Sequence, residues 1–68
     1  MKERFQAGDL VVATMGYKDL WYAEEIIQGR LYRVIKSDSD CFRIKVRSFR
    51  DGTEYQGYYS EHMFEFMD

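Results

Sequence analysis

Alternation of apolar and basic residues is the clearest pattern in this sequence. From residue 42 to residue 47, every second residue is apolar and every residue between is Arg or Lys. A period of two is typical of a strand that buries one face. We therefore predict a strand over 42–47. Its expected inward residues are Phe42, Ile44 and Val46, and its expected outward residues are Arg43, Lys45 and Arg47.

Four further short segments are predicted to be strands. Leu10–Ala13 and Leu31–Lys36 are apolar and contain β-branched residues, which favour strands. Thr53–Tyr59 follows a turn signal and is expected to pair with the preceding strand. Phe64–Phe66 is expected to be a short closing strand.

Turn-forming residues separate these segments. Gly8-Asp9 and the polar run Ser37–Asp40 are expected to be turns. Asp51-Gly52 is typical of a tight type I′ hairpin turn, which requires positive φ angles. Ser60–Met63 is expected to be a single tight turn in which Ser60 caps a backbone N–H.

Residues 17–28 do not follow either regular pattern. Leu20, Trp21, Tyr22 and Ala23 are consecutive apolar residues, whereas an amphipathic helix keeps its apolar residues on one face. We expect a long folded-back loop with one helical turn.

The predicted elements indicate an all-β domain. At 68 residues the chain is expected to be a single domain, spanning residues 1–68. Long unpaired strand edges promote aggregation. Closure of five short strands into a small barrel avoids such edges.

The order of these features resembles an SH3-like barrel, with a long first loop and a one-turn helix before the last strand. Three segments carry a closer resemblance: Gly8–Val11, Gly29–Val34 and Tyr59–Glu65. On these segments the chain looks like the small SH3-like proteins often encoded by phages and prophages, and the resemblance covers nearly the whole chain. It implies a five-stranded SH3-like barrel and a phage-type accessory protein or inhibitor that docks on a host macromolecule.

One function of the wider SH3 family is not carried over. Peptide-binding SH3 domains use a tryptophan after the second loop and a proline near the last turn. This chain has Cys41-Phe42 at the first place and contains no proline. We therefore do not expect it to bind proline-rich peptides.

Residues that carry catalysis or bind metals are scarce. Glu24 and Glu25 are adjacent, so their side chains point apart in a helix or a strand. His62 is the single histidine, and a metal site needs several ligands. We expect no enzymatic activity, no metal and no cofactor.

The lone cysteine and the N-terminal residues bear on localisation. Cys41 has no partner for an internal disulfide, and it is expected to be a partly buried residue at the start of a strand. Residues 1–5 lack the apolar stretch of a signal peptide. No apolar run approaches the ~18 residues of a membrane span. We expect a cytoplasmic protein that is not in a membrane.

Charge is sorted along the chain, although the net charge is only −2. Residues 30–50 contain seven basic and two acidic residues, and residues 51–68 contain five acidic residues and no Lys or Arg. The candidate basic patch consists of Arg33, Arg43, Lys45 and Arg47. It predicts either a nucleic-acid interface, a surface for an acidic protein, or a solvated face paired with Glu54. The isoelectric point of 5.3 favours the last two interpretations, because nucleic-acid-binding domains are usually basic.

Aromatic residues are more numerous than so small a core requires. The chain has six Tyr, five Phe and one Trp, and exposed Tyr and Trp are frequent binding hot spots. The predicted partner-binding residues are Tyr17, Trp21, Tyr22, Tyr58 and Tyr59. The first loop and the closing turn are expected to lie side by side, so that these residues form one surface. Its expected acidic rim is Glu24, Glu25 and Glu61.

The function predicted from the sequence is a non-enzymatic protein-interaction module. Trp21 is the expected hot spot of its surface, and Trp21→Ala is expected to cost more than ~2 kcal/mol of binding. The alternative is a nucleic-acid-binding barrel that uses the basic sheet face. The oligomeric state stays open.

Overall fold

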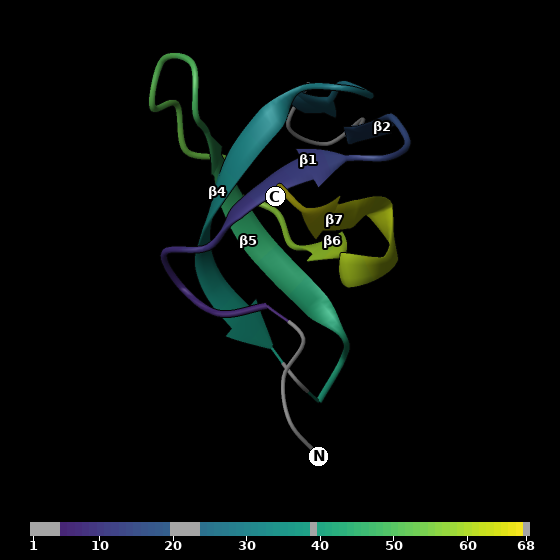
Figure 1. Cartoon of the computed structure of the whole chain (residues 1–68). Helices are drawn as coiled ribbons and strands as arrows, with labels where there is room; N and C mark the ends of the chain where they lie inside the picture. Colours follow the sequence, from purple (N-terminus) through teal and green to yellow (C-terminus); the bar gives the residue numbers. More distant parts are fainter. Residues whose placement is uncertain (1–4, 20–23, 39, 68) are drawn as a thin grey trace.

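Strands dominate the computed structural model of this chain, which describes residues 5–19, 24–38 and 40–67 (Figure 1). The described strands are β1 (Leu10–Ala13), β2 (Tyr17–Asp19), β3 (Glu24–Ile26), β4 (Leu31–Asp38), β5 (Arg43–Ser48), β6 (Tyr59–Ser60) and β7 (Phe64–Phe66). A short 3-10 helix, η1 (Glu61–Met63), stands between β6 and β7. The all-β prediction is confirmed.

Five of the strands form one antiparallel sheet in the order β6-β5-β4-β1-β7, and β2 pairs with β3 in a separate hairpin. β6 and β7 lie at opposite edges of the sheet, although only the three residues of η1 separate them along the chain. The sheet therefore curves so that its two edges approach each other (Figure 1). In the part of the chain that the structure describes, no ladder joins β6 to β7, and the sheet is not closed into a barrel.

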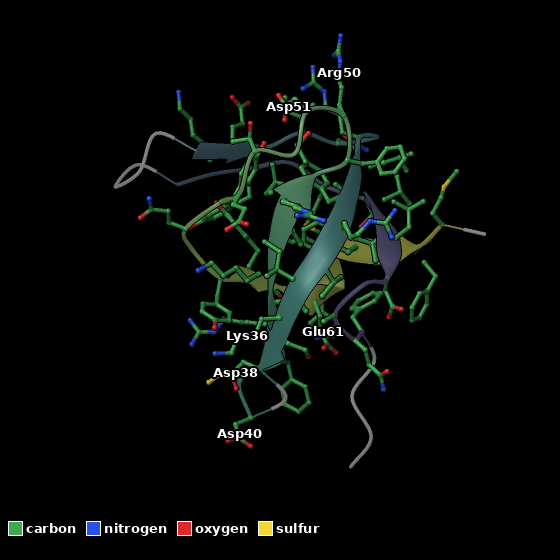
Figure 2. All side chains as sticks on the ribbon, turned by 90° about the vertical axis from the view of Figure 1, so that its left-hand side faces the viewer. Lys36, Asp38, Asp40, Arg50, Asp51 and Glu61 are labelled. Atoms are coloured by element: carbon green, nitrogen blue, oxygen red, sulfur yellow. The ribbon has the colours of Figure 1, made fainter. Side chains whose placement is uncertain are left out.

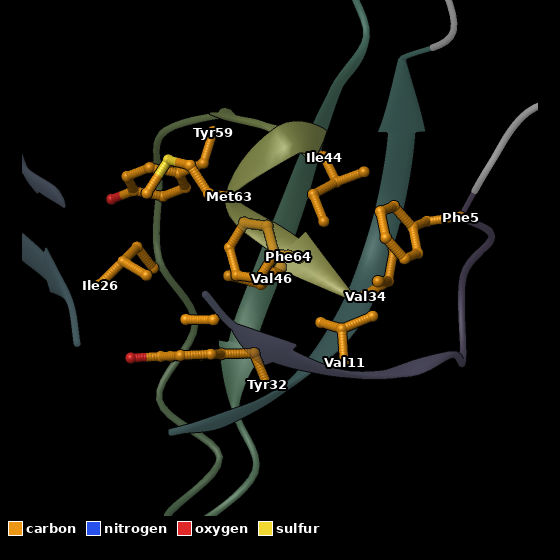
Figure 3. Close-up of a cluster of buried hydrophobic side chains, with 11 residues drawn as sticks. Phe5, Val11, Ile26, Tyr32, Val34, Ile44, Val46, Tyr59, Met63 and Phe64 are labelled. Carbon is orange, nitrogen blue, oxygen red and sulfur yellow. The ribbon is translucent and has the colours of Figure 1, made fainter. Parts of the chain in front are cut away.

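Alternating side chains from the concave side of this sheet form the core (Figure 3). Val11 and Ala13 of β1, and Ile44 and Val46 of β5, are buried, because alternate residues of a strand point to the same face. Aromatic rings provide most of the remaining volume. The buried core residues are Phe5, Val11, Ala13, Ile26, Tyr32, Val34, Ile44, Val46, Tyr59, Met63 and Phe64.

A bulge in β4 changes which side chains face outward. Tyr32 and Val34 point into the core, and strict alternation would send Lys36 inward as well. The register with β5 shifts between Val34 and Lys36, so that one residue more lies on β4 than on β5. A bulge of this kind re-aims the side chains that follow it. Lys36 is therefore exposed and lies opposite Lys45.

The end of the chain follows the sequence prediction closely. The Ser60 hydroxyl accepts a hydrogen bond from the His62 N–H at 3.3 Å, which caps η1. Thr14 ties β1 to the same turn, because its N–H and its hydroxyl both donate to the Met63 carbonyl. The predicted tight turn and the closing strand 64–66 are confirmed.

The first loop is where the prediction was wrong. Residues 17–19 and 24–26 form the β2–β3 hairpin instead of a loop with a helical turn. Ile26 is buried, and the Ile27 N–H donates to the Tyr32 hydroxyl at 3.0 Å. These contacts with the core fix the base of the hairpin, and local sequence pattern does not reveal them.

The two hairpin loops beside β5 also differ from the prediction. Phe42 is not an inward strand residue, because it has φ 55° in the turn before β5 and is 48% exposed. Cys41, in the same turn, is exposed rather than partly buried. Asp51-Gly52 is not a two-residue type I′ turn, since Gly52 has a positive φ and Asp51 does not. Ser48 donates its N–H to the Thr53 carbonyl across a four-residue loop.

The segment after that loop is less regular than predicted. Between residues 53 and 58 the structure has an isolated bridge from Glu54 to Arg47, and regular pairing with β5 returns only at β6. Tyr55 still packs on the core. Within the described residues, no helix is long and apolar enough to cross a membrane.

Candidate functional site

Five basic side chains lie along the outer face of β4 and β5, and we call them the basic row. Ladder pairing places Arg33 opposite Arg47 and Lys36 opposite Lys45. The members of the basic row are Arg33, Lys36, Arg43, Lys45 and Arg47. The structure thus brings together all four residues of the predicted basic patch, and the β4 bulge adds Lys36. Figure 2 faces this side of the molecule.

The basic row contains two pairs of like charges at directly opposed positions. Like charges directly across a ladder are destabilising. Opposite charges occur at its ends, where Asp38 lies opposite Arg43 and Glu54 forms a bridge with Arg47. The predicted pairing with Glu54 therefore exists at the level of the backbone. Arg47 thus has Glu54 opposite it on one side and Arg33 on the other, whereas in the described ladders Lys36 and Lys45 lie opposite only each other.

Two exposed phenylalanine rings stand immediately before and after β5. Phe42 is 48% exposed and Phe49 is 50% exposed. An exposed Phe ring forgoes the free energy that its burial would provide, so two of them at the ends of one basic strand are notable. The sequence prediction assigned Phe42 to the core and overlooked Phe49. The signal for Phe49 was its place after the strand, directly between Ser48 and Arg50.

Arginine and aromatic side chains contact each other at both ends of the basic row. The Arg33 Cζ atom lies 5.6 Å from the centroid of the Phe49 ring, and the Arg43 Cζ atom lies 5.9 Å from the centroid of the Tyr58 ring. Both distances are within the range of a cation–π contact. Arg33 is also held by its donation from Nη1 to the Gly8 carbonyl at 2.8 Å. An arginine therefore contacts an aromatic ring at each end of the basic row.

A shallow pocket adjoins the Phe49 end of the basic row. It is lined by Arg30, Leu31, Phe49 and Arg50. The Phe49 N–H donates to the Leu31 carbonyl at 3.2 Å, which joins the two segments that form the pocket. Two cationic and two apolar residues therefore line the pocket.

The predicted aromatic surface is only partly assembled by the described residues. Tyr17 is 48% exposed, and its ring meets the buried ring of Tyr59 edge-on at 5.4 Å between centroids. The first hairpin and the closing segment therefore do lie side by side. Tyr59 is 2% exposed and supports Tyr17 from the core. Trp21 and Tyr22 lie outside the described residues.

Tyr58 belongs to a different surface from Tyr17. Its ring lies over Arg43, at one end of the basic row, while the adjacent Tyr59 points into the core. Neighbouring strand residues point to opposite faces of a sheet. The described members of the predicted surface, Tyr17, Tyr58 and Tyr59, therefore do not share one face.

The expected acidic rim also changes. Glu61 is a buried residue of η1, and its N–H donates to the Phe42 carbonyl at 2.9 Å, so the prediction of a rim position for Glu61 was wrong. Glu25 is exposed and lies opposite Lys18 in the β2–β3 hairpin.

Two groups near the pocket have shifted acidities. Burial, followed by the neighbouring Tyr32, raises the pKa of Tyr55 to about 12. Hydrogen bonding from Thr53 lowers the pKa of Asp51, and the Thr53 N–H lies 3.0 Å from the Asp51 Oδ1 atom. Among the described residues, no group of three or more His, Cys, Asp or Glu side chains is placed to hold a metal ion. The described site therefore presents cationic and aromatic side chains to a ligand.

Comparison of the chain with protein-family models, with curated proteins and with solved structures gives no match.

Proposed function

We propose that this chain is a non-enzymatic interaction module that binds single-stranded nucleic acid along the basic row. The observation that carries this proposal is the placement of exposed Phe rings at both ends of β5, beside opposed pairs of cations. Cations neutralise phosphates, and aromatic rings stack on bases. A segment that presents only carboxylates would use the cations but would leave the rings without a matching group.

The electrostatic repulsion between the opposed cations also favours an anionic partner. Arg33 with Arg47, and Lys36 with Lys45, repel each other in the free protein. A phosphate backbone that crosses the ladder relieves this repulsion. The acidic isoelectric point of 5.3 averages over the whole chain, whereas binding depends on the charge of the face that meets the ligand.

The scaffold for this surface is proposed to be an SH3-like barrel. Support comes from the strand order, the capped 3-10 turn before the last strand, and the short connection between the two edge strands. Barrels of comparable size bind single strands through basic and aromatic side chains on one face.

The proposal is tested by fluorescence anisotropy with a labelled single strand of about ten nucleotides, a length within the usual site sizes. A matched abasic strand keeps the phosphates but has no bases to stack on the Phe rings. The double variant F42L/F49L is expected to weaken binding of the normal strand and to leave binding of the abasic strand unchanged. Equal affinities of the wild-type protein for both strands would exclude stacking. Stronger competition by polyglutamate than by nucleic acid would favour an acidic protein.

A second candidate function is protein docking at Tyr17. Tyr17 is exposed and is held in place by the buried Tyr59 ring, and a fixed, exposed aromatic side chain suits a binding hot spot. This candidate retains the phage-type accessory role, in which the domain docks on a host protein. Affinity capture from a bacterial lysate tests it, with Tyr17→Ala compared with Tyr58→Ala. Loss of the same captured protein with Tyr17→Ala alone supports docking, and equal capture by both variants opposes it.

A further inference from the structure

The pocket beside the basic row differs from the row itself in shape and in composition. Arg30 and Leu31 approach from the start of β4, and Phe49 and Arg50 approach from the loop after β5. Arg33 lies against the Phe49 ring and brings a third guanidinium to the site. Arg50 lies at the outer end of this loop (Figure 2). The pocket is therefore a local concentration of arginine around one exposed ring.

Backbone hydrogen bonds fix both arginines of the pocket. The Arg30 N–H donates to the Ile27 carbonyl at 3.1 Å, and the Arg30 carbonyl accepts from the Ala13 N–H at 3.0 Å. The Arg50 N–H donates to the Ser48 hydroxyl at 3.2 Å. The backbone positions of both arginines are thus fixed on the two segments that form the pocket.

We infer that this pocket binds a phosphate that is joined to a planar base. Guanidinium groups bind phosphate oxygens in a bidentate manner, which matches Arg30 and Arg50. The exposed Phe49 ring provides a stacking surface for the base. The same chemistry is present in a free nucleotide and in the phosphorylated end of a single strand. In the second case, the inference rests on the proposed function and makes the pocket the end of the strand-binding surface.

One carboxylate adjoins the pocket. Asp51 follows Arg50 directly, and hydrogen bonding from Thr53 lowers the pKa of its carboxyl group. Its Oδ1 atom accepts a hydrogen bond from the Thr53 N–H, which holds the carboxylate in its own loop. The site retains an excess of positive charge, because Arg30, Arg33 and Arg50 outnumber this one anion.

The test uses the whole chain and follows binding by nuclear magnetic resonance, with adenosine monophosphate, adenosine and inorganic phosphate as separate ligands. We expect the monophosphate to bind more tightly than either part, and to shift the amide signals of Leu31, Phe49 and Arg50. Arg50→Gln is expected to weaken binding about tenfold or more, because a charge-assisted hydrogen bond is lost. Phe49→Leu is expected to weaken binding of the monophosphate but not binding of inorganic phosphate. Phe49→Tyr, which keeps an aromatic ring, is expected to bind the monophosphate as the wild-type protein does.

Lys18→Gln is the matched control, since Lys18 is an exposed cation of the β2–β3 hairpin and belongs neither to the basic row nor to the lining of the pocket. It is expected to leave monophosphate affinity unchanged. Equal affinities for the monophosphate and inorganic phosphate would overturn the role of Phe49. An unchanged affinity in Arg50→Gln would overturn the pocket.

Two further strands separate the sources of the ligand. Single strands with a 5′-phosphate and with a 5′-hydroxyl are compared with the free monophosphate. Tighter binding of the phosphorylated strand than of the hydroxyl strand, together with weak monophosphate binding, identifies a strand end as the ligand. Tight monophosphate binding with no preference between the two strands identifies a free nucleotide. If both strands bind alike and the monophosphate does not bind, the pocket inference fails while the proposed function stands. If monophosphate binds and neither strand does, the proposed function fails while the pocket stands.

Discussion

Phe42 combines backbone strain with an exposed ring. Its φ of 55° is rare for a residue with a bulky side chain, and left-handed backbone costs an L-residue about 1–2 kcal/mol. The loop after β5 ends in the same way, but there the residue with positive φ is Gly52. Strain of this kind is characteristic of functional positions. The Phe ring is therefore better explained by binding than by stability.

Phe42→Asn separates these two roles. Asparagine tolerates the left-handed conformation better than phenylalanine does, so we expect the free energy of unfolding to rise by up to about 1 kcal/mol. The same change is expected to weaken single-strand binding, because a stacking ring is lost. Urea denaturation and anisotropy measure the two effects. A destabilised variant with unchanged binding would show that Phe42 serves the fold.

Tyr55 gives the fold a dependence on alkaline pH. Its pKa is about 12 in the folded protein, against about 10 in an unfolded chain. Between these values the folded state holds a proton that the unfolded state has lost. The contribution of Tyr55 to the free energy of unfolding is therefore fully present below about pH 10 and decreases as the pH rises towards 12.

Tyr55→Phe removes this ionisation. We expect urea denaturation midpoints of the variant to fall less steeply between about pH 10 and pH 12 than those of the wild-type protein. Tyr17→Phe, at an exposed ring, serves as the control and is expected to retain the wild-type slope. Identical slopes for Tyr55→Phe and the wild-type protein would contradict the assignment to Tyr55.

At the level of elements, local sequence pattern identified several of the strands. Leu10–Ala13 and Phe64–Phe66 have the predicted bounds, and Ile44 and Val46 point inward as expected. The β2–β3 hairpin was not predictable in this way, because it is fixed by the burial of Ile26 in the core and by the hydrogen bond from the Ile27 N–H to the Tyr32 hydroxyl. Tertiary contacts of this kind override local propensity.

The site shows the same division between local and long-range information. The outward positions of Arg43, Lys45 and Arg47 follow from alternation alone. Lys36 joins them only because of the β4 bulge, which the sequence does not signal. Tyr58 and Tyr59 were predicted to share a surface, but adjacent strand residues face opposite ways. The exposed position of Phe42 depends on turn geometry rather than on hydrophobicity.

The β4–β5 ladder allows stability and binding to be changed in opposite directions. Lys45→Glu converts the pair with Lys36 into an opposite-charge pair. We expect unfolding to require about 0.2–1 kcal/mol more free energy at low salt, with single-strand affinity reduced. Thermal denaturation and anisotropy measure these quantities.

Lys18→Glu is the matched control in the other hairpin. Lys18 lies opposite Glu25, so the same substitution creates a like-charge pair there. It is expected to lower stability slightly and to leave single-strand affinity unchanged at moderate salt. If Lys18→Glu reduced affinity as much as Lys45→Glu, binding would depend on net charge and not on the basic row.

For the whole molecule, the arrangement of charge matters more than its sum. The chain carries a net charge of −2, which by itself argues against a nucleic-acid ligand. Folding nevertheless places five cations on one outer face, because β4 and β5 pair there. The curved sheet buries Tyr59 and Glu61 on its other side. The result is a small domain with one distinctly basic surface.

The salt dependence of single-strand binding tests whether the basic row binds phosphates. Anisotropy titrations of the wild-type protein, from low to moderate salt, give the slope of log affinity against log salt concentration. Each phosphate contact contributes about −0.7 for a single strand, so three or more contacts by the basic row predict a slope steeper than about −2. Lys45→Gln is expected to reduce that slope by about 0.7. A slope near zero, or no binding at low salt, would contradict the account.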